Sequence, residues 1–186
     1  MPLTLDILKQ YKMYNSFVET GTSEGEGVAL AVECGFSPIF SIETILEKYV
    51  KCLKRFENNK DVFLLYGDST KWMDNLVKSL ASDRAYGSVY WLDAHYSSHP
   101  VEKPAGDCCP LLNEIHSIAK NNVEKTNHVL LIDDMRYFDR GGIPLWNNIN
   151  TEQIMREINS NFYESRFCRQ DSPIAKNDIL VAFVVI

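Results

Sequence analysis

Short apolar runs alternate with longer stretches of helical spacing along most of this chain. That rhythm is typical of βα units, in which strands pair in parallel and helices cover the sheet. The expected strands are Ser16–Glu19, Ile39–Ile42, Val62–Tyr66, Ser88–Leu92 and His128–Ile132. The expected helices are Ser23–Cys34, Thr44–Asn58, Thr70–Leu80, Pro110–Lys120 and Thr151–Ser160.

The end of the chain departs from this rhythm. Phe162–Arg169 and Ile179–Ile186 are strand-like runs joined by a connection rich in Pro, Asn and Asp, which predicts an antiparallel hairpin at the sheet edge. We therefore expect an α/β fold: a Rossmann-like, seven-stranded, mostly parallel sheet sandwiched by helices, with a C-terminal antiparallel strand hairpin. The length of 186 residues suits a single domain, 1–186.

Charge and hydropathy exclude several classes of function. The formal net charge is −6 and no basic stripe with interleaved aromatics is present, which argues against nucleic-acid binding. No apolar run approaches the ~20 residues that cross a bilayer, so we expect no membrane span. The first residues lack the pattern of a signal peptide. The five cysteines are scattered and odd in number, which favours reduced thiols and a cytoplasmic protein.

The segment Phe17–Gly27 carries the strongest sign of a ligand site. An apolar run stops at Glu19 and enters a glycine-punctuated turn before a helical pattern, and such a turn lets the backbone approach a ligand closely. Gly21, Gly25 and Gly27 do not match the GxGxxG spacing of a pyrophosphate-binding loop. A carboxylate here would repel a diphosphate but pair with a cationic ligand, which favours S-adenosylmethionine over a dinucleotide.

Acids follow most of the other expected strands. Ligands of open parallel sheets bind beyond the carboxyl ends of the strands, so these acids are the residues to examine. Glu43 stands where a carboxylate would accept hydrogen bonds from ribose hydroxyls, and Asp68 would face the adenine amino group. Ser69 would either help there or cap the following helix.

Asp93, Asp133 and Asp134 end two further strands and form a second group. Three converging carboxylates repel one another, and a hard divalent cation such as Mg²⁺ or Mn²⁺ relieves that repulsion. A substrate hydroxyl bound to the ion becomes more acidic, and a nearby base can then remove its proton. The alternative is that the Asp-Asp pair only ends a strand and caps a turn.

Histidines and cysteines supply further candidates. His95, two residues past the acid of Trp91–His95, would act as general base at the cleft mouth, or would be structural. His99 is expected in a substrate loop or at the surface, whereas His116 and His128 are expected to be structural. The adjacent thiols of Cys108 and Cys109 lack the CxxC spacing of a zinc site. Aromatic residues that would line an acceptor pocket are Trp91, Tyr96, Tyr137, Phe138 and Trp146, although Trp91 is expected in the core.

At these residues the chain resembles the class I S-adenosylmethionine-dependent methyltransferases over nearly its whole length. The motifs are most similar to those of macrocin-type and FkbM-like O-methyltransferases, some of which act on sugar hydroxyls with Mg²⁺. They are Val18–Gly25, Phe40–Glu43, Leu65–Ser69, Trp91–His95 and Leu131–Asp134. The resemblance implies an O-methyltransferase that methylates a hydroxyl of a sugar or glycan.

The resemblance also implies roles for individual residues. The acids that bind the metal in that group correspond to Asp93, Asp133 and Asp134, and Asp93 and His95 would be catalytic. The expected cofactor-binding residues are Glu19, Thr20, Gly21, Thr22, Gly25, Glu43, Asp68, Ser69 and Asp93. The chain is short and lacks the N-terminal helical lid of many small-molecule methyltransferases. A large glycan, a partner domain or a second copy in a homo-oligomer would complete the acceptor side, and the chain would then be one domain of a longer polypeptide or a subunit.

Two other functions share parts of this pattern. An NAD-dependent oxidoreductase would also begin with a strand, a glycine turn and a helix, but the missing GxGxxG and the acid at Glu19 count against it. A non-catalytic module that keeps the cofactor fold for binding or assembly is the third possibility. Loss of turnover on Asp93→Ala would separate the enzyme from that module.

Overall fold

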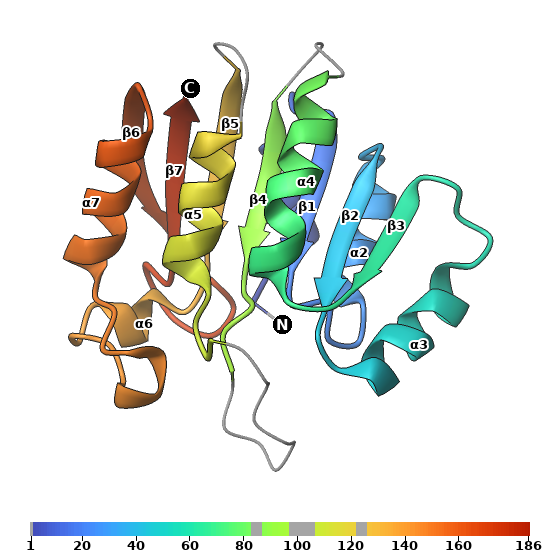
Figure 1. Ribbon diagram of the computed structural model, residues 1–186, viewed down its shortest axis with the longest axis horizontal. Helices are drawn as coiled ribbons and strands as arrows, with labels where there is room; N and C mark the ends of the chain where they lie inside the picture. The colour runs from blue at the N-terminus through green and yellow to red at the C-terminus, as the bar shows by residue number, and fades with distance from the viewer. Residues whose placement is uncertain (1, 83–86, 97–106, 122–125) are drawn as a thin grey trace.

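The computed structural model describes residues 2–82, 87–96, 107–121 and 126–186 (Figure 1). The strands are β1 Ser16–Thr20, β2 Ile39–Glu43, β3 Val62–Tyr66, β4 Ser88–Leu92, β5 Asn127–Ile132, β6 Glu164–Gln170 and β7 Ile179–Val185. The α-helices are α1 Leu5–Lys9, α2 Glu26–Cys34, α3 Leu46–Phe56, α4 Ser69–Ser82, α5 Leu111–Lys120, α6 Met135–Phe138 and α7 Thr151–Asn161. A 3-10 turn, η1, spans Pro144–Trp146.

The seven strands form one sheet in the order β3-β2-β1-β4-β5-β7-β6. The pairs from β3 to β5 are parallel, and β7 lies antiparallel between β5 and β6. The expected fold class is therefore confirmed, including the C-terminal hairpin. Because β1 has β2 on one side and β4 on the other, the strand order reverses at β1, and the ends of β1 and β4 flank the position where ligands bind in open α/β sheets.

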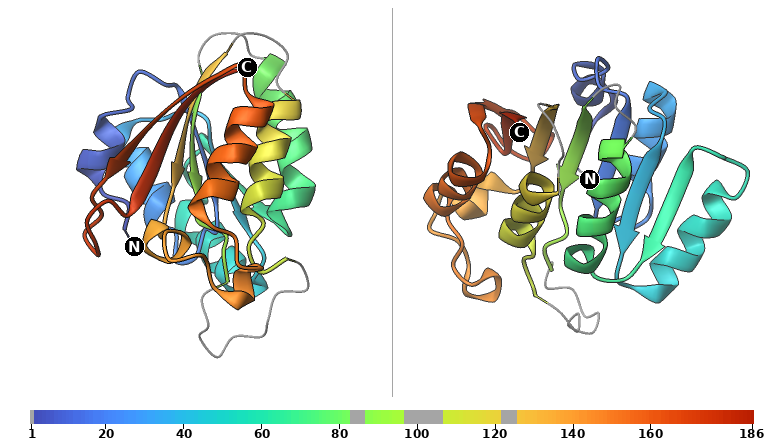
Figure 2. Two further views of the ribbon diagram at one scale, coloured as in Figure 1. Left: turned by 90° about the vertical axis from the view of Figure 1, so that its left-hand side faces the viewer. Right: turned by 45° about the horizontal axis from the view of Figure 1, so that its top comes forward.

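Helices cover both faces of the sheet (Figure 2). Successive strand residues point to opposite faces, so Phe17 packs in the core cluster with α1 and α2, whereas Val18 packs with α4, α5 and α7. The central strands β1 and β4 are buried along their whole length. The sequence of β4 is almost entirely apolar, whereas β1 also carries Ser16, Glu19 and Thr20, whose side chains are hydrogen-bonded.

Several boundaries differ from expectation for local reasons. The helix expected from Ser23 begins at Glu26, because Gly25 lies in the left-handed region at φ 82°. The helix expected over Thr151–Ser160 begins at Thr151, and Asn150 caps it through a capping box with Gln153. The short helices α1 and α6 and the turn η1 have too few residues to show a helical period, and the sequence did not predict them.

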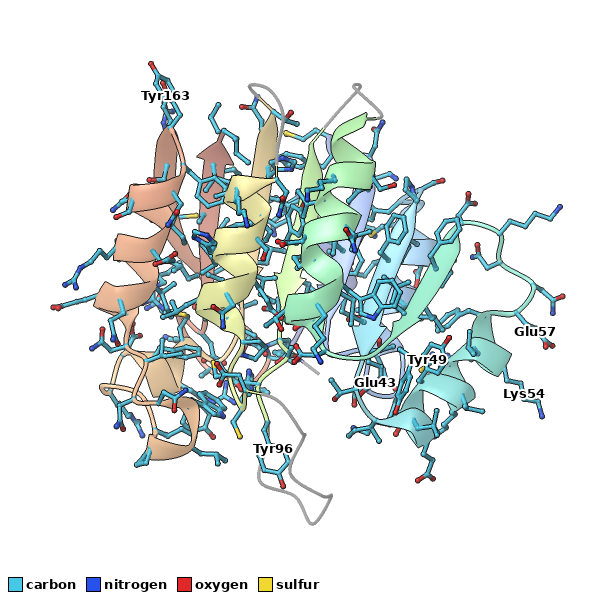
Figure 3. All side chains as sticks on the ribbon, viewed as in Figure 1. Glu43, Tyr49, Lys54, Glu57, Tyr96 and Tyr163 are labelled. Atoms are coloured by element: carbon cyan, nitrogen blue, oxygen red, sulfur yellow. The ribbon has the colours of Figure 1, made fainter. Side chains whose placement is uncertain are left out.

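The carboxyl ends of the parallel strands meet at the lower edge of the molecule in Figure 1. In Figure 3, Glu43 and Tyr96 both lie at this edge, although they follow different strands. None of the described helices is both long and apolar enough to cross a bilayer.

Candidate functional site

The turn after β1 lies between the ends of β2 and β4. On the β2 side, the amides of Gly21 and Thr22 both donate to the carbonyl of Ile42, at 3.0 and 3.2 Å. Gly21 has φ +86°, and a Cβ atom on it would lie 2.7 Å from the carbonyl oxygen of Asp93. A side chain is thereby excluded, and the turn presents bare backbone beside the end of β4.

Glu19 lies in β1 just before this turn and is completely buried. Its Oε2 accepts a 2.6 Å hydrogen bond from Ser41, whose hydroxyl also lies 2.6 Å from that of Thr22. Its Oε1 has no hydrogen-bond partner. Burial raises the pKa of Glu19 to about 8, and the carboxylate of Asp93 adds to the rise, while the Ser41 hydrogen bond opposes it. The unpartnered oxygen is a ready acceptor for a cationic or donor group.

Glu43, at the end of β2, holds two loops together. Its Oε2 accepts from the amide of Ser23 at 2.7 Å, and its Oε1 accepts from the amide of Ile45 at 2.8 Å. Each carboxylate oxygen can accept a second hydrogen bond, so these contacts leave capacity for ligand hydroxyls. The carboxyl group predicted to meet a ribose is thus fixed in place beside the glycine turn.

Asp68 and Ser69 follow the end of β3, and the structure decides between the two roles that the sequence left open for Ser69. The Oδ1 atom of Asp68 accepts from the amide and the hydroxyl of Thr70, at 2.9 and 2.7 Å, so Asp68 caps α4. Ser69 does not cap that helix, because its hydroxyl donates instead to Glu114 Oε1. Asp68 remains half-buried at the strand end.

Glu114, on α5, is a buried acid that sequence reasoning missed. Besides Ser69, it accepts a 3.4 Å hydrogen bond from Thr20 Oγ1 at the end of β1. Burial raises the pKa of Glu114 to about 7, against the two hydroxyl hydrogen bonds that lower it. Glu114 shares the buried face of α5 with Leu111 and Ile118, three residues before and four residues after it, so the helical spacing could have marked it as an acid on a core face. It ties two segments predicted to hold the cofactor to α5.

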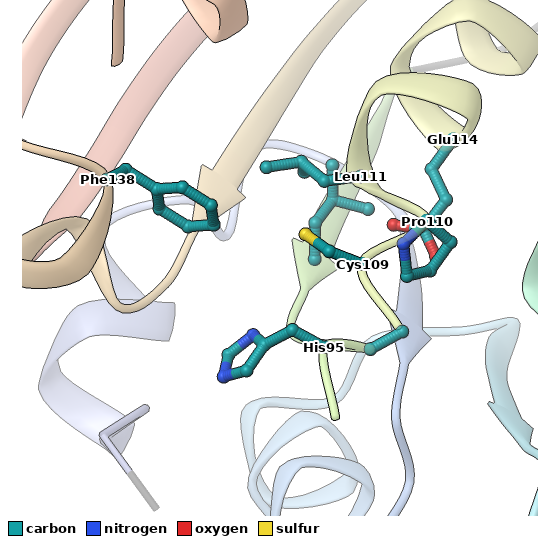
Figure 4. A pocket seen from close by; sticks show the side chains of 8 residues that line it. His95, Cys109, Pro110, Leu111, Glu114 and Phe138 are labelled. Atoms are coloured by element: carbon teal, nitrogen blue, oxygen red, sulfur yellow. The ribbon is translucent and has the colours of Figure 1, made fainter. Parts of the chain in front are cut away.

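Glu114 and His95 both line a small pocket beyond the end of β4 (Figure 4). The remaining walls are mostly apolar and include Cys109, Leu111 and Phe138. The pocket therefore joins the donor-side segments to the acid cluster around His95.

His95 lies between two carboxylates. Its Nε2 is 2.5 Å from Asp134 Oδ2, and its Nδ1 is 3.5 Å from Asp93 Oδ1. Burial alone would lower the pKa of His95, but the hydrogen bond to Asp134 and the charge of Asp93 outweigh it and raise that pKa. Burial raises the pKa of Asp93 to about 6, and His95 partly offsets this. The two carboxylates therefore stabilise the positive charge that the imidazole gains when it takes up a proton.

Asp134 and Asp133, at the end of β5, occupy contrasting surroundings. Burial acts to raise the pKa of Asp134, but its contacts with His95 and Arg136 prevail and lower it. Asp133 is 2% exposed and its Oδ1 has no partner. Burial, with the nearby charges of Asp93 and Asp134, raises the pKa of Asp133 to about 9. A backbone hydrogen bond from Asp134 opposes the rise, so Asp133 is a buried acid with one partnered and one unpartnered oxygen.

Two acid clusters among the described residues bring donor atoms close enough for one metal ion. Asp93, His95 and Asp134 form one, and Asp133, Asp134 and Asp178 form the other. Asp134 belongs to both, whereas the predicted partners Asp93 and Asp133 fall in different clusters. Asp178, from the connection before β7, was not predicted.

An aromatic ring packs against His95, and two further rings pack against that ring. The Trp146 ring centroid lies 4.1 Å from that of His95, and Tyr137 and Phe138 both contact Trp146. Trp146 is 3% exposed, so it forms a wall and not an open stacking platform, whereas Tyr137 is 39% exposed. Trp91 is fully buried, as expected for a core residue.

The remaining histidines and the cysteines lie outside the two acid clusters or outside the described residues. His128 is buried and its Nδ1 accepts from the amide of Ser88, which agrees with a structural role. His116 is exposed and 3.6 Å from Glu157. Neither acid cluster contains a cysteine among the described residues, and His99 lies outside those residues.

No protein-family model matches this chain, and no curated protein sequence matches it. Solved structures do. An O-methyltransferase from Bacillus cereus in complex with S-adenosylhomocysteine aligns with TM-score 0.65 and 15% identity, covering 98% of this chain and 79% of that one. A glycopeptide N-methyltransferase complexed with S-adenosylhomocysteine gives TM-score 0.60 and 10% identity, over 98% and 88% of the two chains.

A SAM-dependent methyltransferase from Aquifex aeolicus is also similar, with TM-score 0.56 and 10% identity over 97% of this chain and 88% of that chain. At these identities the likeness establishes the fold, and this fold is the one that those methyltransferases share. The residues that act on a donor and an acceptor must be argued from the site itself.

Proposed function

We propose that this chain is an S-adenosylmethionine-dependent O-methyltransferase, that it methylates a hydroxyl group of a sugar or glycan, and that a divalent cation assists it. We further propose that residues 1–186 act as one methyltransferase domain in the cytoplasm. The observation that carries the proposal is the close packing of Gly21 against Asp93. Because of it, the turn after β1 lies beside the acid cluster of Asp93, His95 and Asp134.

The residues around the turn suit an S-adenosylmethionine donor. Glu19 offers the unpartnered Oε1 to a positively charged ligand, and Gly21 leaves room for close approach. Glu43 has lone pairs left for ribose hydroxyls, and Asp68 stands at the next strand end for the adenine amino group. Four further residues belong to the proposed site through the same segments: Thr20, Thr22, Gly25 and Ser69.

The two acid clusters, which share Asp134, suit Mg²⁺ or Mn²⁺. Carboxylate oxygens are the donors that these hard cations prefer, and Asp133 has an oxygen with no other partner. Asp134, which belongs to both clusters, would hold the ion together with Asp93 and Asp133, and these two side chains would turn toward each other to do so. When bound, the cation would make a coordinated substrate hydroxyl more acidic.

His95 is the proposed general base. Its Nδ1 is 3.5 Å from Asp93, too far for a strong hydrogen bond, so this nitrogen remains available to receive a proton. In the reaction, the acceptor oxygen forms a bond to the methyl carbon, the bond from that carbon to the donor sulfur breaks, and His95 takes the hydroxyl proton. Asp134 then stabilises the imidazolium.

The acceptor is proposed from the family resemblance and from the exposed ring of Tyr137, which can pack against a sugar. A second copy of the chain or a further domain would complete the acceptor side. An NAD-dependent reaction is less well supported, because Glu19 and the glycine spacing disfavour a diphosphate. A binding module without activity is not favoured by any contact at the site.

Calorimetry with S-adenosylhomocysteine tests the donor half of the proposal. Folded protein that gives no binding heat would eliminate it. Turnover with a panel of sugar acceptors, measured before and after chelation and after Mg²⁺ is restored, tests the other half. Activity that survives chelation would remove the cation and leave the methyl transfer.

A further inference from the structure

The connection between β6 and β7 contributes Asp178 to the acid cluster that contains Asp133 and Asp134. The proposed function does not use Asp178. Asp178 is fully buried. Its carbonyl accepts from the amide of Met135 at 2.9 Å, and its Oδ1 accepts from the amide of Arg136 at 3.1 Å. Its Oδ2 accepts from Ser172 at 2.9 Å. One side chain thus ties the first turn of α6 to the hairpin connection.

Arg136 extends this contact to the site. One guanidinium nitrogen pairs with Asp178 Oδ2 and another pairs with Asp134 Oδ1. A guanidinium can hold two carboxylates at fixed directions because its donors form a rigid planar fork. The Cζ atom of this guanidinium lies over the ring of Tyr137, 4.7 Å from the centroid.

The residue held in this way has an unusual backbone. Asp134 has φ +60°, in the left-handed region that residues other than glycine seldom adopt. Asp adopts this region more readily than most residues, but the conformation still has an energetic cost that surrounding contacts can offset. Its Oδ1 is held by Arg136, and its Oδ2 faces His95 Nε2 at 2.5 Å.

We propose that Arg136 and Asp178 are positioning residues that hold Asp134 in its left-handed conformation, with its carboxylate directed at His95. The hairpin connection, distant in sequence, thereby fixes the orientation of the proposed base. The catalytic meaning of this arrangement rests on the proposed function, but the arrangement itself can be tested without substrate or donor.

The test is the imidazole Nε2–H proton of His95, observed by NMR in ¹⁵N-labelled protein at neutral pH. A proton hydrogen-bonded to a carboxylate on a mostly buried ring gives a downfield resonance that exchanges slowly with water. His95→Gln assigns the resonance. We expect the wild type to show it, and both Asp178→Asn and Arg136→Met to lose it, because Asp134 is then released.

Asp139→Asn is the matched control. Asp139 also joins the end of α6 to the hairpin, through an ion pair with Arg169 at 2.6 Å. Arg169 is not the residue that pairs with Asp134, since that residue is Arg136. This variant is expected to keep the resonance. Arg136→Lys provides a second variant if Asp178→Asn does not fold, since an ammonium keeps the charge without the fork, and it is also expected to lose the signal.

Two outcomes would overturn the positioning role: a wild-type spectrum without the His95 resonance, or its retention in Arg136→Met and Arg136→Lys. If the protein turns over a methyl acceptor, kcat should fall at least tenfold in Asp178→Asn, while the Kd for S-adenosylhomocysteine changes less than twofold. Wild-type protein that does not bind S-adenosylhomocysteine would refute the proposed function and leave the NMR result standing.

Discussion

A Cβ atom on Gly21 would lie 2.7 Å from the carbonyl oxygen of Asp93. Because side-chain carbons do not approach a carbonyl oxygen so closely, the turn after β1 and the end of β4 fit together only through glycine. The proposed donor residues and the acid cluster are therefore held at one spacing by backbone packing.

Gly21→Ala is expected to destabilise the fold and weaken donor binding. The left-handed φ of +86° and the collision with Asp93 both act against a methyl group, for a loss of about 2–4 kcal/mol in the free energy of unfolding. Gly141→Ala is the control, since Gly141 has φ +92° with nothing within 4 Å and should lose only about 1–2 kcal/mol. Urea denaturation measures both, and equal losses would mean that the contact with Asp93 carries no constraint.

Glu19→Gln is expected to weaken S-adenosylhomocysteine binding about 10- to 100-fold, because it removes a charge-assisted hydrogen bond to the ligand's ammonium group. The variant retains an oxygen that can accept from Ser41. Ser41→Ala removes that hydrogen bond but keeps the carboxyl group, so its effect should be below tenfold. Titration calorimetry at pH 8 distinguishes the two, and an unchanged affinity in Glu19→Gln would exclude a direct ligand contact.

Glu114 should make stability depend on pH. Its pKa is about 7 in the folded protein, above the ordinary 4.5, so between these values the folded state holds a proton that the unfolded state has released. The stability contribution of this group therefore falls as pH rises from about 5 to 8, by roughly 2–3 kcal/mol.

Glu114→Gln is expected to lose that dependence. The difference in the free energy of unfolding between wild type and variant should shrink, then change in favour of the variant, as pH rises. Glu57→Gln, on an exposed side chain, controls for the substitution itself. Parallel stability curves for wild type and Glu114→Gln between pH 5 and 8 would contradict the account of this buried acid.

Asp133→Asn is expected to stabilise the metal-free protein by about 1–2 kcal/mol, because it removes a buried carboxyl group with an unpartnered oxygen. The same change should abolish any rise of Tm on adding Mg²⁺. Asp139→Asn, at the exposed end of α6, should keep that response. Thermal unfolding in chelator and in MgCl₂ decides, and a wild-type Tm that does not respond to the cation argues against a metal at this cluster.

The sequence predicted the parallel strands well because short runs rich in apolar residues alternate with stretches of helical spacing. Most residues of β1, β2, β4 and β5 are buried, whereas the edge strand β3 is partly exposed. It also identified the acids at the strand ends, since position in a parallel sheet places such residues at one edge. The division of Asp93 and Asp133 between two clusters could not be predicted, because it depends on side-chain directions within that edge.

The residues that sequence reasoning missed act through contacts between distant segments. Glu114 reaches Thr20 across 94 positions, and Arg136 reaches Asp178 across 42. Periodicity could have placed Glu114 on the buried face of α5, but nothing in the local sequence identifies Thr20 or Asp178 as the partner. Asp68 was expected to face a ligand, and in the structure it also caps α4. The sequence could not assign this cap, because the side chain of the neighbouring Ser69 is equally suited to it.

The most direct test of the central claim is isothermal titration of the folded wild-type protein with S-adenosylhomocysteine. The proposed site predicts saturable binding with one ligand per chain, reduced in Gly21→Ala and Glu19→Gln but retained in Gly141→Ala. Absence of binding by wild-type protein whose circular dichroism shows it to be folded would contradict the claim that the turn after β1 holds a methyl donor.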